Sequence, residues 1–98
     1  MSKFNELINS NTPVLVDFFA EWCGPCKMMQ PILKDVKSQL GEDVKVLKID
    51  IDKNPAVANA YSIQGVPTLM IFKYGEIKWR QSGVRQANEL VSLIKQYS

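Results

Sequence analysis

The sequence predicts an α/β fold with a mixed β-sheet of four strands and helices on both faces. Apolar runs that fit buried strands alternate with segments whose apolar residues recur at helical spacing. The last two strand-like runs are separated only by a short connection that contains glycine, which is typical of a hairpin. Strands that alternate with helices pair in parallel through right-handed crossovers, whereas hairpin strands are antiparallel, so both kinds of pairing are expected.

The chain should begin with a short helix and a buried strand. Phe4, Leu7 and Ile8 lie three and four residues apart, which predicts one face of a helix that starts near Ser2. Residues 13–20, PVLVDFFA, are almost continuously apolar. Such a run is expected for a strand that is buried on both faces.

A longer helix should follow from Cys26 onward. Its apolar residues recur on one face: Met29, Ile32, Leu33, Val36 and Leu40. Gly41 should end this helix, because glycine readily adopts the left-handed conformation of a C-terminal cap. Pro31 lies inside the helix and should bend it or remove one of its hydrogen bonds.

The second half of the chain predicts three more strands and two more helices. Residues 44–51 read as a strand, and the turn DKNP leads into a short helix near Ala56–Tyr61. Residues 67–73 and 77–82 read as strands on either side of YGE, which suits a tight hairpin. A closing helix is indicated by apolar residues at helical spacing: Leu90, Leu93, Ile94 and Tyr97.

The length and composition fit one globular domain that spans residues 1–98. The net charge of +2 comes from scattered residues without a basic cluster, which argues against a nucleic-acid partner. No apolar stretch approaches the ~20 residues that cross a bilayer, so no membrane partner is expected. The first ten residues lack the apolar core of a signal peptide, which makes the reducing cytoplasm the expected compartment.

The only two cysteines, Cys23 and Cys26, lie in the stretch FFAEWCGPCKMM. A structural zinc site needs four ligands, usually Cys and His, and the chain has no His, so we expect no metal. A purely structural disulfide is the second alternative. It would close only a four-residue loop, and in the chain-entropy model such a short loop gives less stabilisation than a longer one.

A redox-active pair is the third alternative and agrees best with the geometry. Residues three apart on a helix have Cβ atoms about 5–6 Å apart, so a small adjustment brings the two sulfurs together. A helix that starts at this motif places Cys23 at its N-terminus, where free amide groups and the helix dipole favour the thiolate. Cys23 would then be the more exposed nucleophile and Cys26 the shielded resolving thiol. Gly24 permits a tight turn, and Pro25 fixes φ where no helical partner is lost.

A CxxC pair between a strand and a helix is typical of thioredoxin-like redox sites. The segment VDFFAEWCGPCK resembles the active-site segment of the thioredoxin family. Further similarity extends through KIDIDKNP at 48–55 and YSIQGVPTLMIFKYGE at 61–76, and includes Pro31 and Gly83. It covers the chain from Val14 to the C-terminus and implies a thioredoxin-like fold.

Two departures from the family pattern carry structural expectations. Thioredoxins usually begin with an additional strand, and this chain is too short at its N-terminus to supply it. Strand 44–51 should therefore lie at the edge of the sheet, where Lys45, Lys48 and Asp50 would discourage pairing with another edge. Phe19 stands where many bacterial relatives have tryptophan, so the packing behind the site should differ.

The resemblance also implies roles for two charged residues. Asp17 interrupts the apolar central strand, and burial should raise the pKa of its carboxyl toward neutral pH. In the family the matching aspartate helps to deprotonate the second cysteine, so Asp17 is the expected proton acceptor. The match places Lys48 near Asp17, although a surface lysine is an equal alternative.

The expected substrate-binding residues surround the cysteines. The resemblance implies a cis peptide bond before Pro67, which would bring the Val66 backbone beside Cys23 and let it pair with an extended substrate. Trp22 should be a partly exposed ring that forms a flat apolar docking patch with Gly65, Val66 and Gly83. Asp50, Asp52 and Asn54 read instead as turn formers and helix caps.

The resemblance implies a general protein-disulfide reductase in cell redox homeostasis and electron transport. It would act as a monomer without a bound cofactor, and the oxidised pair would be reduced by a flavin- and NADPH-dependent thioredoxin reductase or by a ferredoxin-linked enzyme. The alternative is a binding module whose surface docks a partner while the thiol chemistry is incidental. Substitution of both cysteines separates the two, because only the reductase needs them.

Overall fold

The computed structural model describes all 98 residues. It confirms the expected order of helices and strands, with one additional 3-10 turn after the long helix. The helices are α1 (Ser2–Ile8), α2 (Gly24–Leu40), α3 (Pro55–Ala60) and α4 (Ala87–Gln96), and the 3-10 turn η1 covers Gly41–Asp43. The strands are β1 (Val14–Phe19), β2 (Lys45–Asp50), β3 (Thr68–Lys73) and β4 (Glu76–Ser82).

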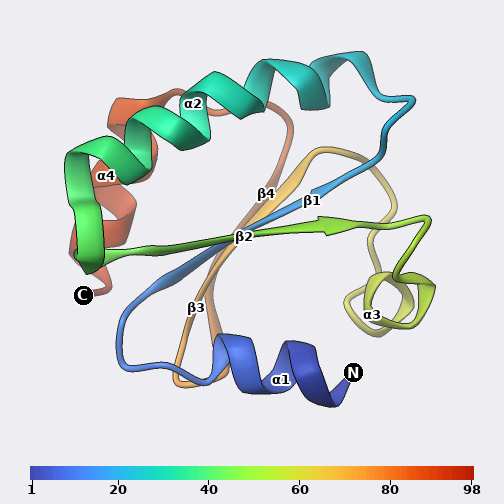
Figure 1. The fold of residues 1–98 in the computed structure, drawn as a ribbon, viewed down its shortest axis with the longest axis horizontal. Helices are drawn as coiled ribbons and strands as arrows, with labels where there is room; N and C mark the ends of the chain where they lie inside the picture. Colours follow the sequence, from blue (N-terminus) through green and yellow to red (C-terminus); the bar gives the residue numbers. More distant parts are fainter.

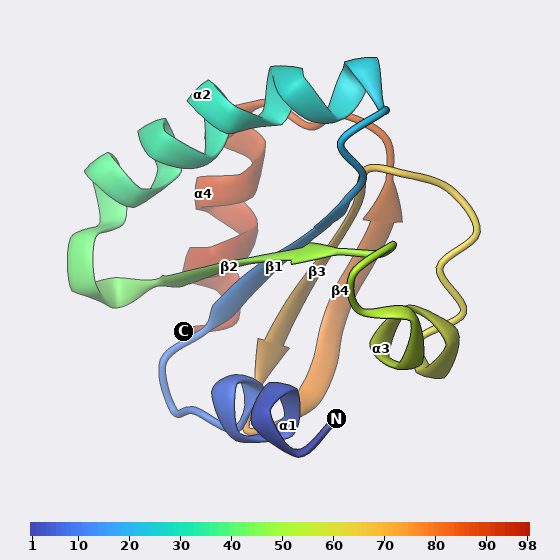
Figure 2. The ribbon, with the colours of Figure 1, turned by 45° about the vertical axis from the view of Figure 1, so that its right-hand side comes forward.

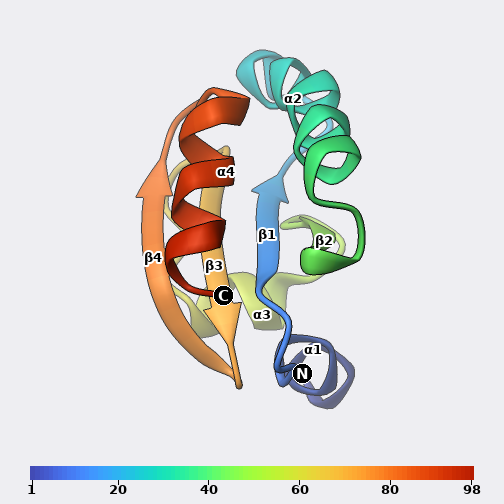
Figure 3. The same cartoon turned by 90° about the vertical axis from the view of Figure 1, so that its left-hand side faces the viewer.

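The four strands form one mixed sheet in the order β2-β1-β3-β4. β1 pairs in parallel with β2 and antiparallel with β3, and β3 pairs antiparallel with β4. The predicted edge position of residues 44–51 is therefore confirmed, since β2 pairs only with β1. Figure 3 shows this arrangement along the sheet, with β2 and β4 at opposite edges.

Helices cover both faces of the sheet, as Figure 1 shows: α2 and α4 lie on one side, and α1 and α3 on the other. Because side chains alternate between the faces of a strand, β1 contributes to a separate apolar core on each side. Leu15 belongs to the core under α2 and α4, whereas Val14, Val16 and Phe18 belong to the core with Phe4 of α1. This double burial explains the continuous apolar run of β1.

Glycines with positive φ occupy the β3–β4 turn and the end of α2. Tyr74 and Gly75 connect β3 to β4, and both have positive φ (52° and 77°), as a tight two-residue hairpin turn requires. Gly41 follows α2 with φ of 54°, and its N–H donates to the Lys37 carbonyl oxygen. α2 is 17 residues long and continues through Pro31 without interruption.

Candidate active site

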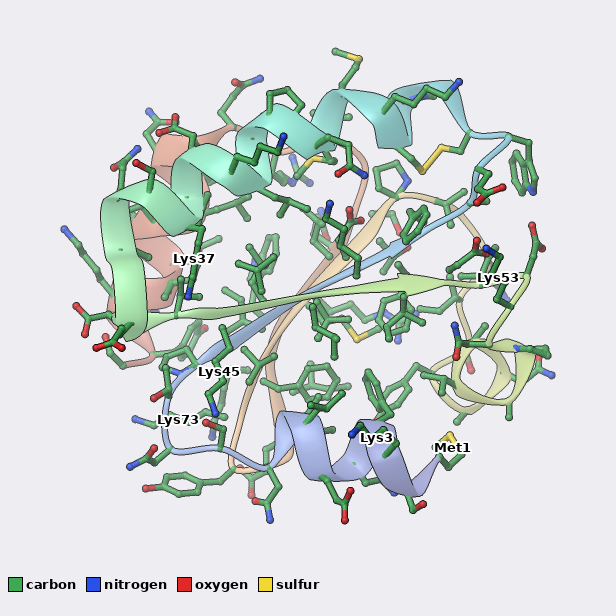
Figure 4. The ribbon with its side chains drawn as sticks, in the orientation of Figure 1. Met1, Lys3, Lys37, Lys45, Lys53 and Lys73 are labelled. Carbon is green, nitrogen blue, oxygen red and sulfur yellow. A yellow bond between two sulfur atoms is a disulfide. The ribbon has the colours of Figure 1, made fainter.

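The two cysteines lie at the start of α2 and are joined by a disulfide with a Cα–Cα distance of 5.3 Å. Figure 4 shows this bond in yellow at the first turn of the helix. Cys23 is the N-cap residue in extended conformation, and its Sγ accepts a hydrogen bond from the Cys26 N–H at 3.1 Å. Gly24 is the first helical residue and Pro25 the second, so the proline occupies a position where its missing N–H has no helical partner to lose.

This cap geometry favours a negative charge on Cys23. An N-cap side chain normally satisfies one of the free amide groups of the first turn, and here a sulfur atom takes that role. The positive end of the helix dipole acts in the same direction. Cys23 and Cys26 are only 4% and 2% exposed, so the expected difference in exposure between them is small in this oxidised structure.

The loop before β3 supplies backbone groups beside the disulfide. The Val66–Pro67 peptide bond is cis, in agreement with the resemblance, and the Val66 carbonyl oxygen lies 3.6 Å from Cys23 Sγ. Gly83 has a φ of 96°, and its N–H donates to the Pro67 carbonyl oxygen at 2.8 Å. In Figure 2 the end of β1, the start of α2 and this loop meet at the same end of the sheet.

Gly65 completes the loop as an exposed residue whose carbonyl oxygen accepts a hydrogen bond from Thr68 Oγ1 at 2.6 Å. Thr68 is itself buried and also lies 3.0 Å from Ser82 Oγ on β4. The side chain of Thr68 therefore ties the loop to the hairpin that ends beside it.

Trp22 is 70% exposed, as predicted for a ring beside the reactive cysteine. Its indole Nε1 donates a hydrogen bond to Asp52 Oδ2 at 2.8 Å. Asp52 was predicted only to form a turn or cap a helix. Its contact with Trp22 could not be predicted, because thirty positions separate the two residues and no local pattern joins them. Asp50 does form the turn, since its Oδ1 accepts from the N–H groups of Asp52 and Lys53 at 2.9 and 3.3 Å.

Asp17 lies in the central strand β1 and is fully buried. Neither of its carboxylate oxygens has a hydrogen-bond partner in the protein. Burial disfavours the charged form and raises the pKa of this carboxyl from its ordinary 3.8 to about 6, while the charge of Lys48 opposes the increase. The predicted direction of this pKa change is therefore supported.

Lys48 is the β2 residue directly opposite Asp17 in the parallel pairing. It is exposed, and its Nζ donates a hydrogen bond to Gln30 Oε1 of α2. Gln30 was not among the residues predicted for the site. Its position one helical turn after Cys26 was the available signal, because residues four apart lie on the same face of a helix.

A small hollow lies beside Cys26, between the end of β1 and the first turns of α2. It has a volume of about 260 Å³ and is lined by Phe19, Ala20, Glu21, Cys26, Lys27 and Gln30. Phe19 also packs against the cluster of Ala20 and the two cysteines, where altered packing was expected. No group of three or more His, Cys, Asp or Glu residues is arranged to hold a metal ion. None of the helices is both long and apolar enough to span a bilayer.

Comparison with known proteins identifies the family. The family model described as Thioredoxin matches residues 1–96. The chain belongs to the thioredoxin family. It is 49% identical over 90 residues to the thioredoxin of Rickettsia prowazekii, which covers 92% of this chain and 86% of that protein. It is also 47% identical over 95 residues to the chloroplastic thioredoxin Y of Oryza sativa, covering 96% of this chain and 56% of the rice protein.

Solved structures give the same result for the fold. A mutant thioredoxin from Halobacterium salinarum superposes with a TM-score of 0.90 at 39% identity, covering 99% of this chain and 84% of that one. The oxidised mitochondrial thioredoxin 3 of Saccharomyces cerevisiae superposes with a TM-score of 0.86 at 35% identity, covering 97% and 88%. The family and the cysteine pair at disulfide distance show that the chain is a thiol–disulfide oxidoreductase.

Proposed function

We propose that the chain is a general protein-disulfide reductase, with residues 1–98 acting as one thioredoxin domain. The observation that supports this most directly is the position of Cys23. Its sulfur accepts a hydrogen bond from the Cys26 N–H at the N-terminus of α2. The same sulfur lies beside the Val66 carbonyl group of the cis-proline loop. A stabilised thiolate beside backbone groups that can pair with a substrate is suited to attack disulfides in proteins of many different sequences.

The proposed reaction has two exchange steps. In the reduced protein the Cys23 thiolate attacks one sulfur of a substrate disulfide, forming a mixed disulfide and releasing the other substrate sulfur as a thiolate. Cys26, once deprotonated, then attacks Cys23 Sγ, which forms the intramolecular disulfide and releases the second substrate thiolate. Two electrons pass from the cysteine pair to the substrate, and both released thiolates are protonated from solvent.

Asp17 is the proposed proton acceptor for Cys26. Its carboxyl has a pKa of about 6 and no fixed hydrogen bonds, so it can accept and return a proton near neutral pH. Lys48 faces it across the β1–β2 pair and limits how far the pKa rises. Gln30 holds Lys48 by its hydrogen bond and also lines the hollow beside Cys26.

The proposed substrate surface consists of Trp22, Gly65, Val66, Pro67 and Gly83. Trp22 is the most exposed of the large hydrophobic residues, and its hydrogen bond to Asp52 fixes the orientation of the ring. The Val66 backbone offers an edge for an extended substrate segment. Such a surface recognises main chain more than side chains, which agrees with a general reductase.

Regeneration requires an external electron donor. We propose a flavin- and NADPH-dependent thioredoxin reductase, with a ferredoxin-linked enzyme as the alternative, and a monomeric protein that works in cytoplasmic redox homeostasis and electron transport. The chloroplastic relative from rice makes the choice of donor a direct experimental question. Reduction of the oxidised chain by each purified donor enzyme answers it.

Reduction of insulin disulfides tests the proposed activity. The wild-type chain should accelerate insulin precipitation in the presence of dithiothreitol, and the variant with both Cys23→Ser and Cys26→Ser should not. Cys26→Ser alone should trap substrates as mixed disulfides on Cys23, which identifies them by mass spectrometry. A double variant that retains full cellular function despite losing insulin reduction would support the binding-module alternative instead.

A further inference from the structure

The free edge of β2 offers unpaired main-chain groups. The Lys45 N–H donates to the Pro13 carbonyl oxygen, and the Ile51 N–H donates to the Phe19 carbonyl oxygen, at 3.0 and 2.9 Å. Because groups facing a given neighbour alternate along a strand, residues 45, 47, 49 and 51 face β1. The N–H and C=O groups of Val46 and Lys48 therefore point away from the sheet, where β2 has no neighbouring strand.

The ends of this edge are already occupied. The Val44 carbonyl oxygen accepts a hydrogen bond from Lys37 Nζ at 2.7 Å, and the Asp50 carbonyl oxygen accepts from the Asn54 N–H at 2.9 Å. The unpaired section is thus confined to Val46–Lys48. A short extended segment, not a long strand, would match its length.

A basic groove runs along the same edge. It has a volume of about 430 Å³ and is lined by Leu33, Lys34, Lys37, Lys45, Val46 and Lys48, with no acidic residue among them. None of these lysines belongs to a salt bridge, because the two that the protein contains join Lys53 to Glu21 and Lys78 to Glu76. Leu33 is buried and Val46 half-buried, so the groove combines two apolar side chains with the four lysines that line it.

The positive charges lie on both faces of the strand. Val46 packs against the core under α2, and Leu47 packs against the core with α1, so Lys48 shares the α2 side with Val46 and Lys45 shares the other side with Leu47. In Figure 4 the Lys37 side chain reaches from α2 to the start of β2, and Lys45 lies between β2 and α1. A strand that paired with this edge would therefore have lysines beside its side chains on both faces of the sheet.

We propose that the β2 edge binds a short extended acidic segment of a partner protein, which pairs with Val46 and Lys48 and places its carboxylates against the flanking lysines. Main-chain pairing at a sheet edge is an established mode of peptide recognition, and the charges specify the partner. A second copy of this chain fits poorly, because antiparallel pairing of two such edges would bring two sets of these lysines together. The surface contains neither cysteine, and it shares with the proposed active site only Lys48.

The test uses a fluorescein-labelled peptide of alternating Glu and Val residues without cysteine, titrated into the full chain by fluorescence anisotropy at low salt. Binding should be at least tenfold weaker for the double variant Lys34→Glu/Lys45→Glu, and unchanged for the matched variant Lys78→Glu/Lys95→Glu. Both variants should keep wild-type insulin reduction, which shows that they are folded. Binding should also weaken as salt is raised.

Two further measurements locate the peptide. Hydrogen exchange followed by NMR should show slower exchange of the Val46 and Lys48 amides on binding, and a peptide with N-methyl groups on the pairing amides should fail to bind. Absence of binding at millimolar peptide, equal binding by the N-methylated peptide, or protection near Val66 instead would overturn the proposal. Sedimentation that shows a dimer with these amides already protected would also overturn it, in favour of a second copy.

Discussion

Two buried carboxylates on neighbouring strands of this protein have opposite surroundings. Asp17 of β1 is fully buried, and neither of its oxygens has a partner. Asp50 of β2 is 8% exposed, and its Oδ1 accepts from two backbone N–H groups. Both lie at the end of the sheet that leads to the cysteines, since Phe19 pairs with Asp50 and is two residues after Asp17.

The difference shows which of the two stabilises the fold. A buried polar group that is hydrogen-bonded holds its neighbours in place, and Asp50 fixes the turn that carries Asp52 and thereby Trp22. A buried carboxylate without partners destabilises the folded chain when it is charged. Asp17 therefore carries a cost in stability that is explained by the proposed proton transfer, whereas Asp50 has a structural role.

The largest effect should come from Asp17→Asn. The change from 3.8 to about 6 corresponds to about 3 kcal/mol of destabilisation above neutral pH, since a tenfold change in an equilibrium is about 1.4 kcal/mol. Asp17→Asn should raise the free energy of unfolding at pH 8 by up to about 3 kcal/mol, as measured in urea. It should also slow the second exchange step. An unchanged reduction rate between pH 6 and 9 would contradict the role of Asp17 as proton acceptor.

The pH dependence of stability should follow the same carboxyl. Its pKa is higher in the folded chain than in the unfolded chain, so between about 4 and about 6 the folded chain binds more protons. The free energy of unfolding should therefore fall as the pH rises through this window, with most of the loss complete by about pH 7. Urea titrations at several pH values should show this decrease in the wild type and not in Asp17→Asn. If the free energy of unfolding changes with pH in the same way in both proteins, another group causes the decrease.

Asp50→Ala should act in the opposite direction. It removes the acceptor of two backbone N–H groups, so the free energy of unfolding should decrease by about 1–2 kcal/mol at pH 8. Trp22 should become more mobile because Asp52 loses its support, which fluorescence anisotropy of the indole can follow. A stabilising Asp50→Ala would remove the distinction between the two carboxylates.

The smallest effects should come from the residues that moderate Asp17. Lys48→Met removes the cation that opposes the pKa increase, so the pKa of Asp17 should rise further and the pH window of the stability loss should move upward. Gln30→Ala frees Lys48 and should cause a smaller change in the same direction. Carboxyl chemical shifts followed by NMR measure both, and Lys95→Met serves as the control. A downward movement in either variant would contradict this arrangement.

Much of the fold could be predicted from local patterns. The apolar run of β1, the helical spacing along α2 and the glycine of the hairpin each depend on neighbours within a few residues, and the structure confirms all three. The family resemblance supplied the edge position of β2 and the cis bond before Pro67. It did not supply the side-chain contacts between distant segments, such as that of Gln30 with Lys48.

The sequence by itself determined the reactive pair and its place, because Cys23, Gly24, Pro25 and Cys26 form a helix start whose chemistry is local. Only the tertiary structure decided which carboxylate would be left without partners and which would gain them. It also decided that Asp52 would hold Trp22 and that lysines from α2 and β2 would line one groove. Those outcomes depend on how separate segments pack, since solvent exclusion and charge proximity are properties of the assembled fold.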